Sequence, residues 1–242
     1  YSYYAVNGAK MWITNAAMAG VMILYARTEE GVSGFMLDAH AEGITVGRDE
    51  HKMGQRGAAT NELALDEVRI GVDQVIGIEG RGQENALETL NVGRAGLAIC
   101  NVGLMHEVVD EVRRGLVGRD PTPVQLYNLG KMALDLVSSE SLSYALVGLT
   151  DHDGTHSLRL ESALAKARSS EALHRVISRA EQILDAEWAL DRHGLEKQRR
   201  DARVITIYEG ANEIQRFLVA RDLVDQLDLD ALRTGGVAGE ST

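Results

Sequence analysis

The chain has 242 residues, 45% of them hydrophobic and 25% charged, which is the composition of a globular protein with one large domain or two modest ones. A formal net charge of -11 excludes nucleic acid as a general partner, because an acidic surface repels phosphate backbones. No apolar run reaches the ~18 residues of a membrane span, and a single cysteine, Cys100, excludes an intrachain disulfide.

The apolar neighbours of Cys100 predict a buried thiol. The sequence begins at Tyr1 rather than at a methionine, and no basic and apolar leader precedes it, so we expect an N-terminal part of the protein to be missing from it. Together with the cysteine usage, this favours a cytoplasmic location.

Residues 1–78 are patterned as a small β domain. Asn7-Gly8 is a strong hairpin-turn signal and predicts a hairpin that joins strands at 3–6 and 10–14. Further strands are expected at 21–26, 34–37, 44–46 and 62–70, separated by glycine-containing turns. Short strands at this spacing predict an antiparallel sheet or barrel.

Residues 79–232 are patterned as an up-and-down four-helix bundle. Apolar residues recur at helical spacing over 84–113, and Pro121 and Pro123 precede a second helix at 124–149. A third helix is expected at 158–190, a fourth at 211–229, and a flexible tail at 233–242. Gly80-Arg81-Gly82 lacks a preceding parallel strand or a Walker lysine, so a domain junction is favoured over a phosphate cradle. The expected fold class is α+β.

The loop at 151–156, Asp-His-Asp-Gly-Thr-His, contains residue types that ligate metals. An EF-hand would need its glycine two residues later and a glutamate where Ser162 stands. A polar connection between helices is therefore favoured, and no metal site is predicted.

Glu209 is the residue with the clearest potential for chemistry. It lies in Ile207-Tyr208-Glu209-Gly210, between two helical segments and just before the last helix. A carboxylate that projects into an apolar cleft there is a suitable general base near pH 7. Spacing alone favours a simpler interpretation, an acid that complements the dipole of a helix start.

Four segments change that balance, because together they resemble the acyl-CoA dehydrogenase family. The C-terminal one comprises Asp201-Ala202-Arg203 and Ile207-Tyr208-Glu209-Gly210-Ala211-Asn212-Glu213-Ile214-Gln215-Arg216. The others are Asn7-Gly8-x-Lys10-Met11-Trp12-Ile13-Thr14-Asn15, which resembles the flavin-facing strand, then Met53-Gly54-Gln55-Arg56 followed by 63–68, and Gly93-Arg94 opening the first long helix. They follow the family's order and span nearly the whole chain.

The resemblance implies a middle β domain and a C-terminal four-helix bundle, without the family's N-terminal helical domain. It implies FAD as cofactor, an acyl-CoA thioester as substrate and an electron-transfer flavoprotein as electron acceptor. Glu209 would remove the α-proton while a hydride leaves the β-carbon for flavin N5. The Glu209 N–H and a flavin ribityl hydroxyl would polarise the thioester carbonyl.

The resemblance also assigns roles to other positions. Arg94 would lie near the base and set its environment, Thr14 would donate its hydroxyl near N5, and Trp12 would pack close to the flavin ring. The cofactor-binding positions as a set are Trp12, Ile13, Thr14, Arg114, Gln182, Ala211 and Glu213. The substrate-binding positions are Tyr208, Glu209, Gly210 and Arg94.

Two segments depart from the family pattern. Gln182-Ile183-Leu184-Asp185-Ala186-Glu187-Trp188 stands where the family has Gln-x-x-Gly-Gly-x-Gly, which contacts the FAD adenosine and pyrophosphate of the neighbouring subunit. Arg113-Arg114-Gly115-Leu116-Val117-Gly118 keeps the family's Arg-x-x-Phe-Gly loop poorly, and Ala211 replaces the usual Thr or Ser. Asp185 adds a negative charge where phosphate would lie, so the resemblance predicts weakened FAD binding in a homo-oligomer.

Three hypotheses follow. The first is an FAD-dependent dehydrogenase of acyl-CoA thioesters, working as a homo- or hetero-oligomer (a dimer or tetramer). The second is a non-catalytic or FAD-deficient subunit of a heteromeric acyl-CoA dehydrogenase. The third is a relative that binds nucleic acid or performs flavin-dependent hydroxylation; the net charge of -11 opposes the former and Glu209 opposes the latter.

Overall fold

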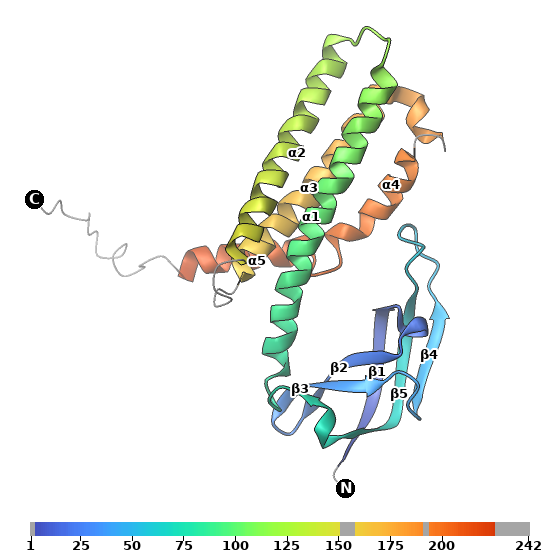
Figure 1. Ribbon diagram of the computed structural model, residues 1–242, viewed down its shortest axis with the longest axis vertical. Helices are drawn as coiled ribbons and strands as arrows, with labels where there is room; N and C mark the ends of the chain where they lie inside the picture. The colour runs from blue at the N-terminus through green and yellow to red at the C-terminus, as the bar shows by residue number, and fades with distance from the viewer. Residues whose placement is uncertain (1–2, 151–157, 191–193, 226–242) are drawn as a thin grey trace, which may run out of the picture. The chain divides into compact units, whose positions relative to one another are not determined.

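The computed structural model describes residues 3–150, 158–190 and 194–225. The chain divides into two compact units, each described below by itself. The first, called the β unit, comprises residues 1–90 and 189–204, and the second, called the helical unit, comprises residues 91–188 and 205–242. Antiparallel strands followed by long helices confirm the predicted α+β class (Figure 1).

The β unit contains two three-stranded antiparallel sheets, with strand orders β1-β5-β4 and β2-β3-β6 (Figure 1). The strands are β1 (Tyr3–Thr14), β2 (Val21–Thr28), β3 (Gly31–Asp38), β4 (Ile44–Asp49), β5 (Thr60–Gly71) and β6 (Val75–Ile76). Their inward side chains form one core, made of Val6, Leu24, Phe35, Leu37, Leu63, Leu65, Val68 and Ile70. The strands expected at 21–26, 34–37, 44–46 and 62–70 are confirmed.

The hairpin expected at Asn7-Gly8 is wrong, because both residues lie inside the single long strand β1. The Asn7 side chain accepts a hydrogen bond from the Glu67 N–H (2.8 Å) and donates one to the Glu67 carboxylate (2.7 Å). Glu67 takes φ 51, and the register of β1 against β5 shifts between Val6 and Gly8. The turn-forming residues of this segment therefore serve a β-bulge, paired with a strand 60 positions away.

The long helices are α1 (Gly82–Leu116), α2 (Pro123–Thr150) and α3 (Arg159–Leu184), and the shorter α5 spans Asn212–Asp225 (Figure 1). The helices expected at 84–113 and 124–149 are confirmed. The third was expected to reach residue 190 but ends at Leu184, because Asp185 takes φ 53 and ψ -138, which a right-handed helix cannot contain. The short helix η3 (Asp185–Ala189) follows, and α4 (Leu195–Ala202) was not predicted.

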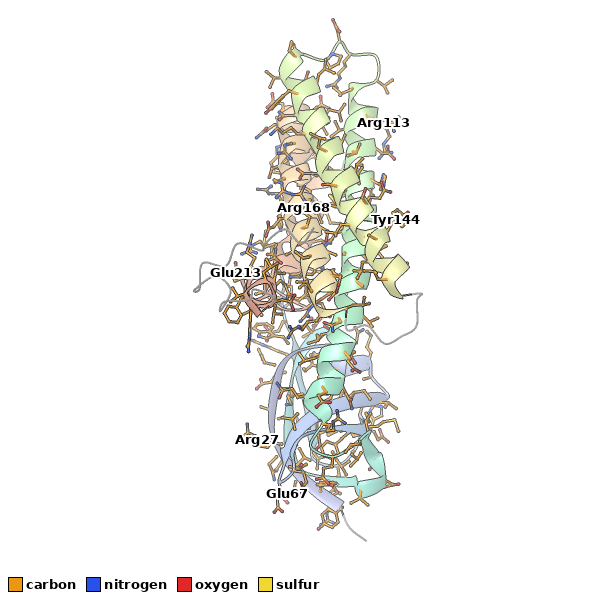
Figure 2. All side chains as sticks on the ribbon, turned by 90° about the vertical axis from the view of Figure 1, so that its left-hand side faces the viewer. Arg27, Glu67, Arg113, Tyr144, Arg168 and Glu213 are labelled. Atoms are coloured by element: carbon orange, nitrogen blue, oxygen red, sulfur yellow. The ribbon has the colours of Figure 1, made fainter. Side chains whose placement is uncertain are left out.

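In the helical unit, α2 and α3 are joined by a buried carboxylate and three partly exposed arginines. Asp135 of α2 is 7% exposed, and its carboxylate accepts hydrogen bonds from Arg168, Arg175 and Arg179 of α3. Burial acts to raise the pKa of Asp135, but the hydrogen bonds from Arg175 and Arg179 outweigh it and hold the pKa below its usual value. Figure 2 shows Arg168 on α3.

Cys100, which was expected to be buried, is exposed on α1. The prediction failed because the apolar run around it faces the bundle on one side only. Among the helices of the described ranges, none is long and apolar enough to cross a membrane. The loop at 151–156 and the tail at 233–242 lie outside the described residues.

Candidate functional site

Residues 208–211, here called the Glu209 turn, connect η5 (Arg203–Thr206) to α5 through an unusual backbone. Glu209 takes φ 55 and Gly210 takes φ 89. Glycine adopts such angles freely, but a side-chain-bearing residue in a sparsely populated region costs about 1–3 kcal/mol and persists only where its surroundings impose it. Residues strained in this way cluster at functional sites, so the backbone itself marks Glu209.

Arg94 is the first residue that holds this turn. Its side chain is 4% exposed, Nε donates to the Glu209 carbonyl (3.0 Å) and Nη1 donates to Oδ1 of Asn91 (3.0 Å). Burial lowers the pKa of the Arg94 guanidinium, and the negative charge of Glu209 acts in the opposite direction. Gly93-Arg94 was expected to open the first long helix. This is wrong, because α1 begins at Gly82 and Arg94 lies well inside it.

Gly93 makes room for the Glu209 carboxylate. A Cβ atom at residue 93 would lie 2.8 Å from Oε2 and 3.3 Å from Cδ of Glu209. Oε2 is buried and has no hydrogen-bond partner among the residues that the structure describes. A buried carboxylate oxygen that lacks a donor is available to accept a proton.

Lys166 of α3 is the second residue that holds the turn, and sequence reasoning missed it. Its side chain is fully buried, and Nζ donates to the Gly210 carbonyl (2.8 Å) and to Oδ1 of Asn212 (2.8 Å). A signal was present in the sequence: the residues three and four positions away along the helix are all small, which leaves space for a buried side chain. These are Ser162, Ala163, Ser169 and Ser170.

Ala211 directly precedes α5, and its carbonyl accepts hydrogen bonds from the N–H groups of Ile214 (2.9 Å) and Gln215 (3.1 Å) in the first turn of that helix. This is the N-cap position, where Ser, Thr, Asp or Asn would satisfy a free N–H, and alanine cannot. Glu213 is exposed in the first turn of α5 (Figure 2), and Tyr208 is 36% exposed. The resemblance named four neighbouring residues of this turn and also Arg94, and the structure brings Arg94 to the turn from 115 positions away.

In the β unit, Trp12 lies at an irregularity of β1. The register shifts between Lys10 and Ile13, so that β1 has one residue more than β5 there. Trp12 takes φ 62, and its side chain is 63% exposed. Bulges often lie beside active sites, where they re-aim a side chain, and an exposed indole on a strained backbone marks this position as unusual.

Ile13 and Thr14 follow with different surroundings. Ile13 packs against the core of the β unit, whereas Thr14 is exposed like Trp12. Ile13 and Thr14 both line a cavity of about 490 Å³, whose walls are mostly apolar and include Met22, Leu24, Leu37, Leu63 and Leu65. That Trp12 and Thr14 contact a flavin stays a prediction.

Two of the segments that carried the resemblance contact each other within the β unit. A Cβ atom at Gly54 would lie 2.1 Å from the Arg200 carbonyl oxygen, so only glycine fits there. The adjacent Gln55 N–H donates to the Asp201 carboxylate. Burial acts to raise the pKa of Asp201, but hydrogen bonds from Lys197 and from the Gln55 N–H hold it below its usual value.

Arg114, a predicted cofactor contact, is engaged elsewhere. Its guanidinium is 63% exposed and pairs with Glu111 one turn earlier on α1 (2.6 Å). Arg113, labelled in Figure 2, pairs in the same way with Asp110 (3.0 Å). Neither arginine contacts the Glu209 turn, and each one's charge is offset by an acid of its own helix.

In the segment at 182–188, the polar side chains make surface contacts, whereas Ile183 and Leu184 are buried. Gln182 is exposed and accepts a hydrogen bond from the Asn128 amide (3.3 Å). Glu187 pairs with Arg119 at 3.1 Å, and both side chains are at least one-third exposed. Asp185 takes φ 53 and ψ -138, a backbone conformation that glycine adopts more readily than aspartate.

Comparison with known proteins gives one consistent result. Residues 80–224 match the family described as "Acyl-CoA dehydrogenase, C-terminal domain", and residues 1–68 match "Acyl-CoA dehydrogenase, middle domain".

Two curated relatives and one solved structure illustrate the similarity. Human short-chain specific acyl-CoA dehydrogenase, mitochondrial, is 34% identical over 233 residues, which cover 91% of this chain and 56% of that protein. The CarC subunit of the caffeyl-CoA reductase-Etf complex of Acetobacterium woodii is 30% identical over 230 residues, covering 90% and 60%. Butyryl-CoA dehydrogenase from Megasphaera elsdenii superposes with a TM-score of 0.85 at 27% identity, covering 92% and 61%. The chain therefore spans 56–61% of the length of these relatives.

Proposed function

Because this chain belongs to the acyl-CoA dehydrogenase family, we propose that it carries out flavin-dependent α,β-dehydrogenation of an acyl-CoA thioester, with Glu209 as the base. The observation that supports this most is the Glu209 turn. A strained glutamate, a buried carboxylate oxygen without a donor and two buried cations on adjacent carbonyls form an arrangement that folding alone does not require.

The residues of this chain divide the work as follows. Glu209 removes the α-proton of the thioester with Oε2, its unpaired oxygen. Among the described residues none accepts a hydrogen bond from the Glu209 N–H, so this donor is free to bind the thioester carbonyl oxygen, where charge develops. Arg94 fixes the Glu209 carbonyl from the other side and keeps a positive charge near the base.

FAD, when bound, supplies the acceptor for the hydride that leaves the β-carbon. The ring-facing positions fit such a cofactor, since Trp12 and Thr14 both present exposed side chains. The positions for the far end of FAD fit poorly: Arg114 and Gln182 have other partners, and the residues from Asp185 to Trp188 present two carboxylates and no glycine.

The test of this function is Glu209→Gln in the full-length protein. The amide keeps the shape of the side chain but cannot accept the proton, so turnover with acyl-CoA should fall by ~10²–10⁴, while thioester affinity stays nearly constant. Glu107→Gln, an exposed position on α1, is the matched control and should behave like the parent. Turnover of Glu209→Gln within about tenfold of the parent would refute the role of Glu209.

We propose that electrons pass onward to an electron-transfer flavoprotein. The support is sequence similarity, since one relative is a subunit of a caffeyl-CoA reductase-Etf complex. Substrate-dependent reduction of a purified electron-transfer flavoprotein, measured by its flavin absorbance, is the test. A cytoplasmic location stays a prediction, since the human relative is named as mitochondrial.

We also propose that the chain acts as an oligomer. The outer face of α2 carries large apolar side chains at heptad-like spacing, all more than half exposed: Tyr127, Leu134, Val137 and Tyr144 (Figure 2 labels Tyr144). Such a stripe fits packing against another helix. Leu134→Glu should lower the mass measured by light scattering, and an unchanged mass would contradict a role of this face.

The poor fit at the far end of FAD supports a second candidate, an FAD-deficient subunit that shares its site with an unlike partner. In this case the partner contributes the cofactor contacts and Glu209 can still serve as the base. The test is the flavin-to-protein absorbance ratio of the full-length protein, purified alone and co-expressed with a candidate partner. Stoichiometric FAD on the protein alone would rule out this alternative and leave the dehydrogenase proposal intact.

A further inference from the structure

Two buried cations from two different helices bind two consecutive carbonyls of the Glu209 turn. Arg94 of α1 donates to the Glu209 carbonyl (3.0 Å), and Lys166 of α3 donates to the Gly210 carbonyl (2.8 Å). These are the two residues of the turn with left-handed backbones, at φ 55 and φ 89. The side chains of Arg94 and Lys166 therefore stabilise the two residues of the turn whose backbone conformation is strained.

Lys166 is not explained by packing. Its side chain is 0% exposed, and among the described residues its hydrogen bonds go to neutral oxygens of Gly210 and Asn212 rather than to a carboxylate. An ammonium removed from water without a paired anion is costly, and a methionine of similar length would fill the same space without that cost. A buried cation that the fold does not need calls for a functional reason.

We propose that Lys166 is a positioning residue that fixes the Gly210 carbonyl and thereby the left-handed backbone that aims the Glu209 carboxylate. This inference rests on the proposed function, in which Glu209 removes the substrate's α-proton. Lys166 touches neither the substrate nor the reacting atoms; it acts through the turn.

The charge of Lys166 is also poised to change within the range of ordinary assays. Burial lowers the pKa of Lys166 to about 8, and the positive charge of Arg94 acts in the same direction. Three carboxylates oppose this shift, namely Glu213 of α5, Glu209 of the turn and Glu171 of α3. Deprotonation replaces a charge-assisted hydrogen bond by a weaker neutral one, so turnover should fall as pH rises through about 8.

Stability should respond in the opposite direction. An unfolded lysine has a pKa of ~10.4, so between about pH 8 and pH 10 the unfolded chain holds a proton that the native Lys166 has released. The free energy of unfolding then rises with pH over this window, because the unfolded state binds more protons. The charge of Lys166 should therefore raise kcat and lower the free energy of unfolding. A residue with a merely structural role would not show these opposite effects.

The experiment compares the parent with Lys166→Met from pH 6 to 9.5, measuring kcat and KM for an acyl-CoA substrate with a dye acceptor. At pH 7 the variant should lose ~10–100-fold in kcat, the usual effect of a displaced catalytic group, with KM within about twofold. The fall in kcat near pH 8 should be present in the parent and absent in the variant. Lys131→Met, at an exposed position of α2, is the matched control and should keep the parent's profile.

Lys166→Met should fold, because both acceptors retain another donor: Gln215 Nε2 reaches the Gly210 carbonyl (3.2 Å) and Ser170 Oγ reaches Oδ1 of Asn212 (3.3 Å). Lys166→Arg keeps a positive charge throughout the range and should restore part of the kcat while the fall near pH 8 disappears. The pH dependence of kcat in the parent tests the proposal even if a variant fails to fold. A parent kcat that does not fall between pH 7 and 9, or a Lys166→Met kcat equal to the parent's, overturns the proposal.

Failure of the proposed function is distinguishable from failure of this inference. A parent without acyl-CoA-dependent turnover refutes the former. The positioning role of Lys166 is then judged by amide hydrogen exchange of residues 207–212 at pH 7, which should be faster in Lys166→Met than in the parent and in Lys131→Met. Unchanged exchange would show that Lys166 does not hold the turn.

Discussion

The Glu209 turn and the segment at 182–188 both present charged side chains, but they use them in opposite ways. At the turn, Arg94 and Lys166 are 4% and 0% exposed, and both donate to backbone carbonyls. At the segment, Arg119 and Glu187 pair on the surface with side chains 51% and 36% exposed. At the Glu209 turn, buried charges stabilise a backbone conformation. At the segment 182–188, the charged groups only pair with each other at the surface.

The difference shows which charges constrain function. An exposed ion pair contributes about 0–1 kcal/mol, so substitutions around it are tolerated, whereas a buried cation must be matched by its surroundings. The region around Glu209 is thus tightly specified, because two buried cations are matched to its backbone. The charged side chains of the segment at 182–188 lie at the surface, and the second hypothesis accordingly concerns FAD retention and not the base.

The contrast between buried and exposed charge is tested most strongly at Asp135. Asp135→Asn removes the carboxylate that three arginines share, so the free energy of unfolding at pH 7 should fall by about 2–4 kcal/mol. Asp110→Asn removes a surface partner of Arg113 and should change stability by less than ~0.5 kcal/mol. Urea unfolding measures both.

The pH dependence of this effect has a definite sign. The native pKa of Asp135 lies below its unfolded value of ~3.9, so its contribution is complete above about pH 4 and is lost as pH falls through the native pKa. Parent and Asp135→Asn should therefore converge in stability as pH is lowered from 4 towards 2. A constant difference across that range would show that the carboxylate charge is not what matters.

Gly93→Ala is expected to break the turn's function without breaking the fold. The new Cβ would meet Oε2 of Glu209 at 2.8 Å, and because this oxygen has no hydrogen-bond donor among the described residues, the carboxylate can swing away. We expect kcat to fall ~10–100-fold from misplacement of the base, with stability unchanged or slightly raised by the better helix former.

Gly96→Ala, three residues further along α1, is the control. A Cβ at residue 96 meets nothing within 4 Å, so the variant should gain helix stability and keep its kcat. Equal losses of activity in both variants would point to helix distortion in place of a collision with Glu209.

Much of the secondary structure followed from local pattern. Alternation and helical periodicity located β2 to β5 and the bodies of α1 and α2. The hairpin at Asn7-Gly8 failed because the same residue types that form turns also form bulges, and the choice depended on Glu67, which is far away in sequence. The predicted end of α3 was wrong because the apolar periodicity of the helix does not predict the backbone angles of Asp185.

The candidate site was predicted only where the family resemblance named residues. Arg94 and Glu209 meet although 115 positions separate them, and spacing alone gave no reason to join them. Lys166 was missed because a lysine in a helix is normally solvated, and its partners, the Gly210 carbonyl and Oδ1 of Asn212, lie 44 and 46 positions away in the sequence. Local chemistry identifies a possible base, while the fold determines what holds it.

Asp185→Gly tests whether the backbone at residue 185 favours glycine. The position has φ 53 and ψ -138, so glycine should relieve strain and raise the free energy of unfolding by about 1–2 kcal/mol. Removing the carboxylate should also raise the flavin-to-protein ratio if this residue disfavours a phosphate. Ala186→Gly, next to it, is the control and should stabilise neither the fold nor the cofactor; a gain equal to that of Asp185→Gly would contradict the strain argument.

The smallest expected effect on stability is at Ala211, because the Glu209 turn lacks a hydrogen-bonding side chain at the N-cap of α5. Ala211 occupies the N-cap of α5, and the free N–H groups of the first turn have no side-chain oxygen to accept their hydrogen bonds from this position. Ala211→Ser should raise the free energy of unfolding by about 0.5–1 kcal/mol. For a chain of this size that is a rise in Tm of about 1–4 °C, measurable by circular dichroism.

The matched control is Ala220→Ser, an exposed position within α5, where serine is a poorer helix former than alanine and should slightly lower the Tm. Opposite signs for the two serine variants would show that the cap, and not the added hydroxyl, is responsible. If Ala211→Ser is neutral or destabilising, the buried cations already hold the turn so firmly that the helix start contributes nothing. The Glu209 turn would then be held by the donors it already has, Arg94, Lys166 and Gln215.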